Sequence, residues 1–221
     1  MTYLTESILK KEFKELPKGI LKILLDTAIY NNISKIAIVG GFIRDIITKS
    51  QHKDAQIKFN DLDIIIEGDV LKYAKELQSL LGIKRVSILR CNKAYKTVEL
   101  AIDDIKIDIA SAREEKYIKA GENPTVKYTT INKDLIRRDL NINAIAFDLK
   151  EEKLIDLFLG SDAISNKKID FLHCLSVTED PTRIIRAARY SARLDFELST
   201  KSIKQIKSTI NYWPWDWHIG D

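Results

Sequence analysis

The spacing of apolar residues along the chain predicts a mixed α and β part followed by a helical part. Apolar runs bounded by turn residues predict strands, and apolar residues three and four apart predict helices. We therefore expect an α+β fold with a mixed central sheet at residues 1–160 and an all-helical region at 161–221. The expected strands are residues 35–39, 61–67, 85–89, 94–102, 105–110, 144–149 and 154–158. The expected helices lie within 5–32, at 42–48, 70–81 and 132–139, and from 162 onward.

Turn and capping residues indicate where several of these elements end. The pair Gly68-Asp69 is expected to cap the helix that follows it, and Asp103-Asp104 to form a tight hairpin between two strands. The segments 49–60 and 113–128 are polar and rich in turn residues, so we expect both to be loops.

Composition narrows the class of protein without indicating a function. The 221 residues are 45% hydrophobic and 31% charged, enough for one large domain or two small ones. No apolar run approaches the ~20 residues of a membrane helix and no secretion signal is recognised, so we expect a soluble, cytoplasmic protein without a membrane partner. Cys91 and Cys174 lack metal-ligand spacing and are expected to be buried free thiols. The formal charge of +4 permits a nucleic-acid partner without establishing one.

The first candidate for chemistry follows the strand at 35–39. Gly40 and Gly41 stand between this strand and a helix, where backbone N–H groups and the helix dipole can face an anion. Asp61 and Asp63 lie two apart on the next strand and share one face. Paired carboxylates beside a phosphate cradle indicate a magnesium site for phosphoryl or nucleotidyl transfer. A simple turn and a solvated strand edge are the alternative interpretation.

Two further groups depend on their distance from this site. Asp108 lies on the polar side of the strand at 105–110, and its pattern alone favours an ordinary solvated position. If its strand neighbours that of Asp61, it becomes a third ligand for the same metal ions. Arg137-Arg138-Asp139 resembles a common surface pair, but near a phosphate cradle its two cations and acceptor can hold a triphosphate and a ribose hydroxyl.

Four arginines on one helix form the last candidate. The helix is expected to open with Glu179-Asp180-Pro181, an acidic cap with proline at the first helical position. Because like charges on one face repel and no acid stands between them, a phosphate-facing role is favoured over a solvated face. The arginines follow at spacings of three, three and four: Arg183, Arg186, Arg189 and Arg193.

Together these motifs resemble those of bacterial-type (class II) tRNA nucleotidyltransferases and poly(A) polymerases, in the same order. The resemblance runs from about residue 36 to about residue 196. It implies a catalytic nucleotidyltransferase head at residues 1–160 and a helical neck at 161–221 that binds RNA and nucleotide. The motifs are residues 40–45 with 61–63, then 107–113, 137–144 and 179–190.

The resemblance also implies roles for individual residues. Asp61 and Asp63 would bind two Mg²⁺ ions, and Asp108 would help to activate the RNA 3′-hydroxyl. The triphosphate would contact Gly40, Gly41, Arg44, Arg138 and Asn143. The ribose would bind Asp139, the Watson–Crick edge of the base would bind Asp180 and Arg183, and Arg186 and Arg189 would lie along the nucleotide.

The implied activity is transfer of a nucleotide from ATP or CTP to the 3′-hydroxyl of a tRNA, adding C, A or both and releasing pyrophosphate. A poly(A) polymerase of the same family is one alternative, and a catalytically silent RNA-binding fragment is another. Family members continue into helical domains that grip the tRNA, so we expect a truncated form or one that needs a partner. Trp213, Trp215 and Trp217 crowd near the C-terminus and fit such an incomplete surface.

Two departures from the family pattern concern local structure. After Asp156 the family commonly has two glycines, and Leu159 takes the place of the first. Leu140-Asn141 stands where the family usually has an aromatic residue and a threonine. We expect the fold to tolerate both changes, with altered local contacts around Leu159.

Overall fold

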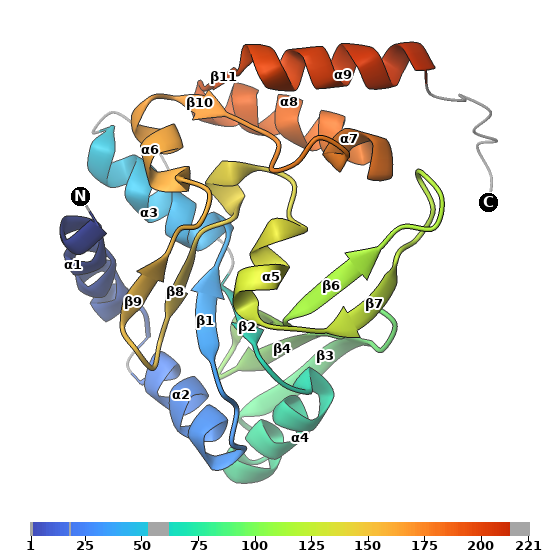
Figure 1. Cartoon of the computed structure of the whole chain (residues 1–221). Helices are drawn as coiled ribbons and strands as arrows, with labels where there is room; N and C mark the ends of the chain where they lie inside the picture. The colour runs from blue at the N-terminus through green and yellow to red at the C-terminus, as the bar shows by residue number, and fades with distance from the viewer. Residues whose placement is uncertain (1, 18, 53–61, 213–221) are drawn as a thin grey trace.

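A mixed β-sheet forms the centre of the computed structural model, which describes residues 2–17, 19–52 and 62–212 (Figure 1). Its seven strands follow the order β3-β4-β5-β2-β1-β8-β9; β2 and β5 run parallel and the other neighbours antiparallel. This confirms the predicted α+β fold with a mixed central sheet. The strands are β1 Ile36–Val39, β2 Leu62–Ile66, β3 Val86–Asn92, β4 Thr97–Ile102, β5 Ile105–Ser111, β8 Ala146–Asp148 and β9 Lys153–Ile155.

The two faces of the sheet are covered differently. One face packs into the larger apolar cluster, beneath α1 Thr2–Glu12, η1 Phe13–Glu15, α2 Ile20–Tyr30, α3 Gly41–Gln51 and α4 Val70–Leu81. The other face carries a smaller cluster beneath α5 Ile131–Ile136, over β1, β2 and β8. All four residues of β1 are buried, as expected for a strand covered on both sides. On the second face, the alternate residues of β4 and β5 are exposed or half-buried, which leaves this part of the sheet accessible.

Two of the predicted turns are confirmed at the level of their hydrogen bonds and dihedral angles. Asp69 caps α4, because its Oδ1 accepts the N–H groups of Leu71 at 2.8 Å and Lys72 at 3.3 Å. Asp103 and Asp104 join β4 to β5 with φ values of +47° and +70°. Such left-handed pairs match the twist of the antiparallel strands that they connect.

The segment 113–128, predicted to be a loop, instead forms a β-hairpin. Its strands, β6 Arg113–Lys116 and β7 Thr125–Tyr128, pair antiparallel with Glu115 opposite Val126. Arg113 and Glu115 turn inward and form an ion pair of 3.0 Å. The strand escaped prediction because charged residues that neutralise one another occupy its inward positions, where apolar residues normally stand.

The prediction of buried thiols is wrong. Cys91 and Cys174 are both free and both exposed. Cys91 lies near the end of β3, an edge strand of the sheet, opposite Val98 of β4. An edge strand has a neighbour on one side, so a residue near its end loses much of the cover that a central strand provides.

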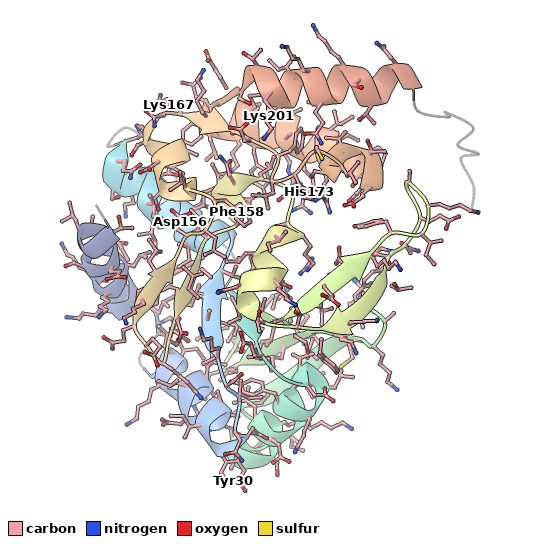
Figure 2. The ribbon with its side chains drawn as sticks, in the orientation of Figure 1. Tyr30, Asp156, Phe158, Lys167, His173 and Lys201 are labelled. Carbon is pink, nitrogen blue, oxygen red and sulfur yellow. The ribbon has the colours of Figure 1, made fainter. Side chains whose placement is uncertain are left out.

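The C-terminal region lies above the end of the sheet where β1 leads into α3 (Figure 1). Asp156, labelled in Figure 2, starts α6 by accepting the N–H groups of Gly160 at 2.7 Å and Ser161 at 2.8 Å. The region was predicted to be all-helical, and its described part is mainly helical. It departs from the prediction where β10 pairs in parallel with β11, a two-residue ladder too short to leave a periodic signal. The elements of this region are α6 Gly160–Ser165, β10 Lys168–Ile169, α7 Ser176–Glu179, α8 Thr182–Leu194, β11 Glu197–Leu198 and α9 Thr200–Tyr212, and the short helix η2 Asn141–Asn143 stands between α5 and β8.

No helix among the described residues has the length and apolar character needed to cross a membrane. Trp213, Trp215 and Trp217 lie outside the described residues, so the predicted incomplete surface around them stays a prediction.

Gly160 stands where a side chain has no room. A Cβ there would come within 2.5 Å of the Asn141 carbonyl oxygen and 2.6 Å of Ile145 Cγ1. Gly160→Ala is therefore expected to lower the free energy of unfolding by about 1–3 kcal/mol, the usual range for overpacking. Urea unfolding followed by circular dichroism measures the change.

Leu159 supplies the matched comparison for that variant. It precedes α6 with φ +52°, and its side chain is 66% exposed, so little burial depends on it. Leu159→Gly relieves left-handed strain of about 1–2 kcal/mol against a glycine entropy cost of about 0.5–1 kcal/mol. Stability should stay equal or rise, and a loss as large as that of Gly160→Ala would contradict this interpretation of the turn.

Candidate active site

The turn at Gly40 brings a cation and a carboxylate together at the end of β1. Gly40 has φ +75°, and its N–H donates to the Ile145 carbonyl oxygen at 3.0 Å. A Cβ on Gly40 would lie 3.5 Å from Arg138 Nη1 and 3.6 Å from Asp63 Oδ2. Two side chains from distant parts of the sequence therefore flank the backbone of this turn, where glycine leaves it accessible.

A cavity of about 560 Å³ opens beside this turn. Its walls come from the Gly40-Gly41 turn, the β6–β7 hairpin, the segment between α5 and β8, and the start of α8. The volume falls within the roughly 300–1,000 Å³ of small-molecule sites. Among its lining residues are nine that the sequence predicted: Gly40, Gly41, Asp63, Arg138, Asp139, Asn143, Asp180, Arg183 and Arg186.

Two other predicted residues do not line this cavity, and a third lies outside the described residues. Arg44 is only 2% exposed and sits behind the turn, with Nη2 3.5 Å from the position of a Cβ on Gly41. Arg189 is exposed on α8, its guanidinium 5.2 Å from the centre of the Tyr190 ring. Asp61 lies outside the described residues.

Asp63 and Asp108 occupy paired positions on neighbouring parallel strands, β2 and β5. The condition under which the sequence made Asp108 a candidate ligand is thus met. Asp108 lines a second cavity, of about 510 Å³, which shares Asp63 and Arg138 with the first. Among the described residues no group of three or more His, Cys, Asp or Glu is arranged to hold a metal ion. A pair of carboxylates nevertheless suits Mg²⁺, which commonly takes one or two carboxylates and completes its shell with water and substrate phosphates.

A cluster of arginines beside the cavity is held in place by Asp134, whose side chain is fully buried. Asp134 Oδ1 lies 2.7 Å from Arg137 Nη2, and its Oδ2 lies 3.1 Å from Arg138 Nη2. Glu115 Oε1 lies 2.9 Å from Arg137 Nη1 and 3.0 Å from Arg113 Nε. Burial and the charge of Arg137 lower the pKa of Arg113. Three arginines thus face two carboxylates, and the excess positive charge is oriented for an anion.

A second network links the Gly40-Gly41 turn to the α5–β8 segment. Arg44 Nε donates to Asp45 Oδ1 at 2.7 Å, and Arg44 Nη1 donates to Asn143 Oδ1 at 2.6 Å. Asn143 Nδ2 in turn donates to Asp139 Oδ1 at 3.3 Å. Asp139 Oδ2 lies 2.7 Å from Arg186 Nε as an ion pair, but it is buried and accepts no hydrogen bond from the described residues. Beside its ion pair with Arg186, this oxygen keeps the capacity to accept a hydrogen bond.

The arginine stripe of α8 is confirmed as a feature of one helix, but its charges are partly neutralised by the protein itself. Arg186 pairs with Asp139, and Arg193 Nη2 lies 3.0 Å from Asp45 Oδ2. Arg183 is 4% exposed and donates to Ser176 Oγ at 2.8 Å and to the Arg137 carbonyl oxygen at 3.0 Å. The sequence analysis expected an external anion to neutralise the arginine stripe. It could not foresee these carboxylates, because they come from distant parts of the sequence.

The start of α8 places an acid beside the buried arginine. The helix begins at Thr182, and Asp180 Oδ1 accepts the Thr182 N–H at 3.0 Å. Asp180 Oδ2 lies 3.8 Å from Arg183 Nε. An acceptor and a donor fixed at the start of a helix present a rigid hydrogen-bonding edge to the cavity.

Tyr117 is a cavity residue that the sequence did not indicate. Its hydroxyl donates to Glu115 Oε2 at 3.2 Å and accepts from Arg183 Nη2 at 3.5 Å, so it joins the β6–β7 hairpin to α8. Burial, with a smaller contribution from Glu115, raises the pKa of Tyr117 to about 12. The hydroxyl stays protonated at neutral pH. The only signal for it was its place within a polar segment, which does not distinguish it from a solvated tyrosine.

The sequence is similar to a known protein family and to tRNA nucleotidyltransferases. Residues 36–170 match the family described as the Poly A polymerase head domain. An A-adding tRNA nucleotidyltransferase of Aquifex aeolicus is 37% identical over 177 residues, and one of Halalkalibacterium halodurans is 34% identical over 176 residues. These matches cover 79% and 78% of this chain but only 20% and 39% of the two relatives. The chain therefore spans well under half the length of these relatives.

Solved structures show the same likeness. A CCA-adding enzyme in an apo form superposes with a TM-score of 0.78 at 32% identity, covering 92% of this chain and 47% of that one. A tRNA nucleotidyltransferase in complex with a primer tRNA and an incoming ATP analog gives a TM-score of 0.69 at 34% identity, covering 85% and 50%. With the match over residues 36–170, these likenesses show that the chain belongs to the poly(A) polymerase head domain family, which includes the tRNA nucleotidyltransferases.

Proposed function

We propose that the chain transfers a nucleotide from ATP or CTP to the 3′-hydroxyl of a tRNA and releases pyrophosphate. The observation that carries the proposal is the meeting of Asp63 and Arg138 at the Gly40 turn, in one cavity with Asp180 and Arg183 of α8. Phosphate-binding groups thus stand at one side of the cavity and base-binding groups at another. The tRNA nucleotidyltransferases among its relatives support the same reaction.

The proposal gives the two parts of the chain different tasks. Residues 1–160 form the catalytic head, which holds the carboxylates and the phosphate-binding turn. Residues 161–221 form the neck, whose α8 presents the edge that selects the base. The tRNA would need further contacts, from a continuation of the chain or from a partner, because the relatives are much longer.

Nucleotidyltransferases of this kind generally depend on a metal ion, and we propose Mg²⁺. Asp63 would hold it together with Asp61, whose part rests on the sequence alone. When bound, Mg²⁺ lowers the pKa of an attacking hydroxyl and stabilises charge on a leaving pyrophosphate. Asp108, paired in register with Asp63, would accept a hydrogen bond from the RNA 3′-hydroxyl and orient it toward the α-phosphorus.

The cavity residues suggest how the nucleotide is held. The N–H groups at Gly40 and Gly41 and the guanidinium of Arg138 would contact the triphosphate. Arg44, buried behind the turn, would act by orienting Asn143, to which it donates. The triphosphate then lies along the charged wall, which fixes its α-phosphorus near Asp63.

The remaining wall would hold the sugar and the base. Asp139 would accept a ribose hydroxyl at its carboxylate, beside the ion pair that its Oδ2 forms with Arg186. Asp180 and Arg183 would bind the Watson–Crick edge of the base, while Arg186 and, one turn further along α8, Arg189 would lie along the nucleotide. A protein edge then selects the base in place of a nucleic-acid template.

The primary prediction concerns nucleotide addition. With Mg²⁺ and labelled ATP or CTP, the chain should extend tRNA transcripts that end at the discriminator base, after one C or after CC. Asp63→Asn should lower the rate roughly 10³-fold, because several kcal/mol of charge stabilisation is lost. Primer-extension gels measure both results, and Asp104→Asn, the same change in an exposed turn, serves as the control.

The pattern of products distinguishes the alternatives. Extension of the CC-ended transcript by ATP alone indicates A addition, CTP incorporation that stops at CC indicates CC addition, and use of both indicates CCA addition. Long A tails on any RNA would favour a poly(A) polymerase. Absence of extension in a chain that still binds RNA would contradict the proposal and favour the catalytically silent fragment.

A second prediction tests the sugar contact. Asp139→Asn keeps the shape of the side chain but weakens Oδ2 as an acceptor, so the preference for ATP over 2′-dATP should fall about tenfold, as expected when a hydrogen bond to a charged group is lost. The measurement is the ratio of kcat/KM for the two nucleotides. Asp45→Asn is the matched control, because Asp45 is a buried acid of the same network that does not line the cavity. An equal change in both variants would contradict a direct ribose contact.

A further inference from the structure

The second cavity, of about 510 Å³, lies over the accessible face of the sheet, where β3, β4, β5 and β2 run side by side. It joins the first cavity at Asp63 and Arg138, which line both. Its other charged and polar lining residues include four that the sequence analysis did not select: Arg90, Asn92, Thr97 and Glu99. The nucleotide and the residues proposed to bind it already occupy the first cavity, so the second is available to the other substrate.

A β-bulge sets which side chain faces this cavity at the edge of the sheet. Ile88 pairs with Leu100, but the register then shifts so that Arg90, rather than Leu89, opposes Glu99. Bulges re-aim side chains in this way. Without the extra residue, Leu89 would stand opposite Glu99 and the edge would lack its cation.

The register places four charged residues in one row across four strands. Arg90 opposes Glu99, Glu99 opposes Asp108, and Asp108 opposes Asp63. Paired residues on neighbouring strands project to the same face of a sheet. The row runs from a cation on the edge strand to the proposed catalytic carboxylates, with the acceptor Glu99 between them.

A second row of paired residues lies beside the first on β3, β4 and β5. Asn92 opposes Thr97, and Thr97 opposes Ala110, whose small side chain leaves space in front of the sheet. Arg90, Asn92 and Thr97 therefore lie at the β3–β4 end of the cavity and Asp108 and Asp63 at the β5–β2 end, with Glu99 of β4 between them. Within the described residues Arg90 is exposed and forms no ion pair, even with Glu99 opposite it. Its charge is available to an external anion.

We propose, on the basis of the function proposed above, that this cavity holds the 3′-terminal nucleotides of the RNA that is extended. Arg90, with Asn92 beside it, binds a backbone phosphate, and the terminal sugar lies over Glu99 with its 3′-hydroxyl at Asp108. β3, which carries Arg90, and β5, which carries Asp108, are two strand spacings apart, roughly 10 Å. A phosphate at Arg90 is thus separated from the reacting hydroxyl, and Glu99 repels phosphate from the centre while accepting a sugar hydroxyl.

The test compares three single variants of the whole chain. Arg90→Ala should weaken binding of a labelled single-stranded RNA hexamer ending in CC by about tenfold, the scale of one lost charge-assisted contact. Its plot of log Kd against log salt should also flatten by about 0.7, one phosphate contact on a single strand. Arg90→Lys should recover most of the affinity. Lys106→Ala removes the same charge from an exposed position of β5 outside the cavity lining and should change neither quantity.

The readouts separate this proposal from the one on which it rests. Fluorescence anisotropy measures RNA binding without turnover, and ATP affinity is measured in parallel by equilibrium dialysis. An Arg90→Ala variant with the RNA affinity and salt dependence of Lys106→Ala would overturn the RNA site while leaving nucleotide addition untouched. A loss confined to ATP affinity would assign the cavity to the nucleotide and would also overturn it.

Discussion

The rest of the site depends on the contacts of one buried group, the guanidinium of Arg44. A cation that is 2% exposed is tolerable only when paired, and here it contacts Asp45 and Asn143. Both partners reach α8: Asp45 directly through Arg193, and Asn143 through Asp139 and Arg186. One buried charge therefore fixes the glycine turn, the α5–β8 segment and the neck helix relative to one another. These three parts form walls of the first cavity, which we propose to be the nucleotide site.

The sheet places the second cavity beside the first, and the two share Asp63 and Arg138. Its parallel pair, β2 and β5, places Asp63 and Asp108 side by side at the junction of the cavities. Arg138 belongs to both and is itself held by the buried Asp134. On one side of the junction lie the groups suited to a nucleotide, and on the other a polar sheet face with a cation at its edge. In the reaction that we propose, two anionic substrates would meet at the carboxylates without sharing the same contacts.

The sequence predicted most of the secondary structure, because the residues that form a cap, a turn or a buried strand are close together in the chain. Gly68-Asp69 and Asp103-Asp104 behave as predicted, since caps and tight turns depend on neighbouring residues. Each predicted apolar strand also forms, although the bounds of several differ: β3 continues to Asn92 and β9 ends at Ile155. The hairpin at 113–128 escaped prediction because its inward positions carry the charged residues Arg113 and Glu115, which pair with each other. The motifs also identified nine of the residues that line the first cavity. The pairing of Asp108 with Asp63 could not be predicted, because it depends on the order of the strands. The Arg90 row depends on a bulge and on the alignment of four strands, neither of which a linear pattern reveals.

The central claim is that the Gly40 turn, Asp63 and α8 form one nucleotide site. It is tested most directly by crystals of the chain soaked with Mn²⁺ and a non-hydrolysable ATP analogue, with diffraction collected at the manganese edge. The account predicts an anomalous peak beside Asp63, a triphosphate along Gly40 and Gly41 within reach of Arg138, and a base against Asp180 and Arg183. A triphosphate bound elsewhere, or manganese bound away from Asp63, would contradict it.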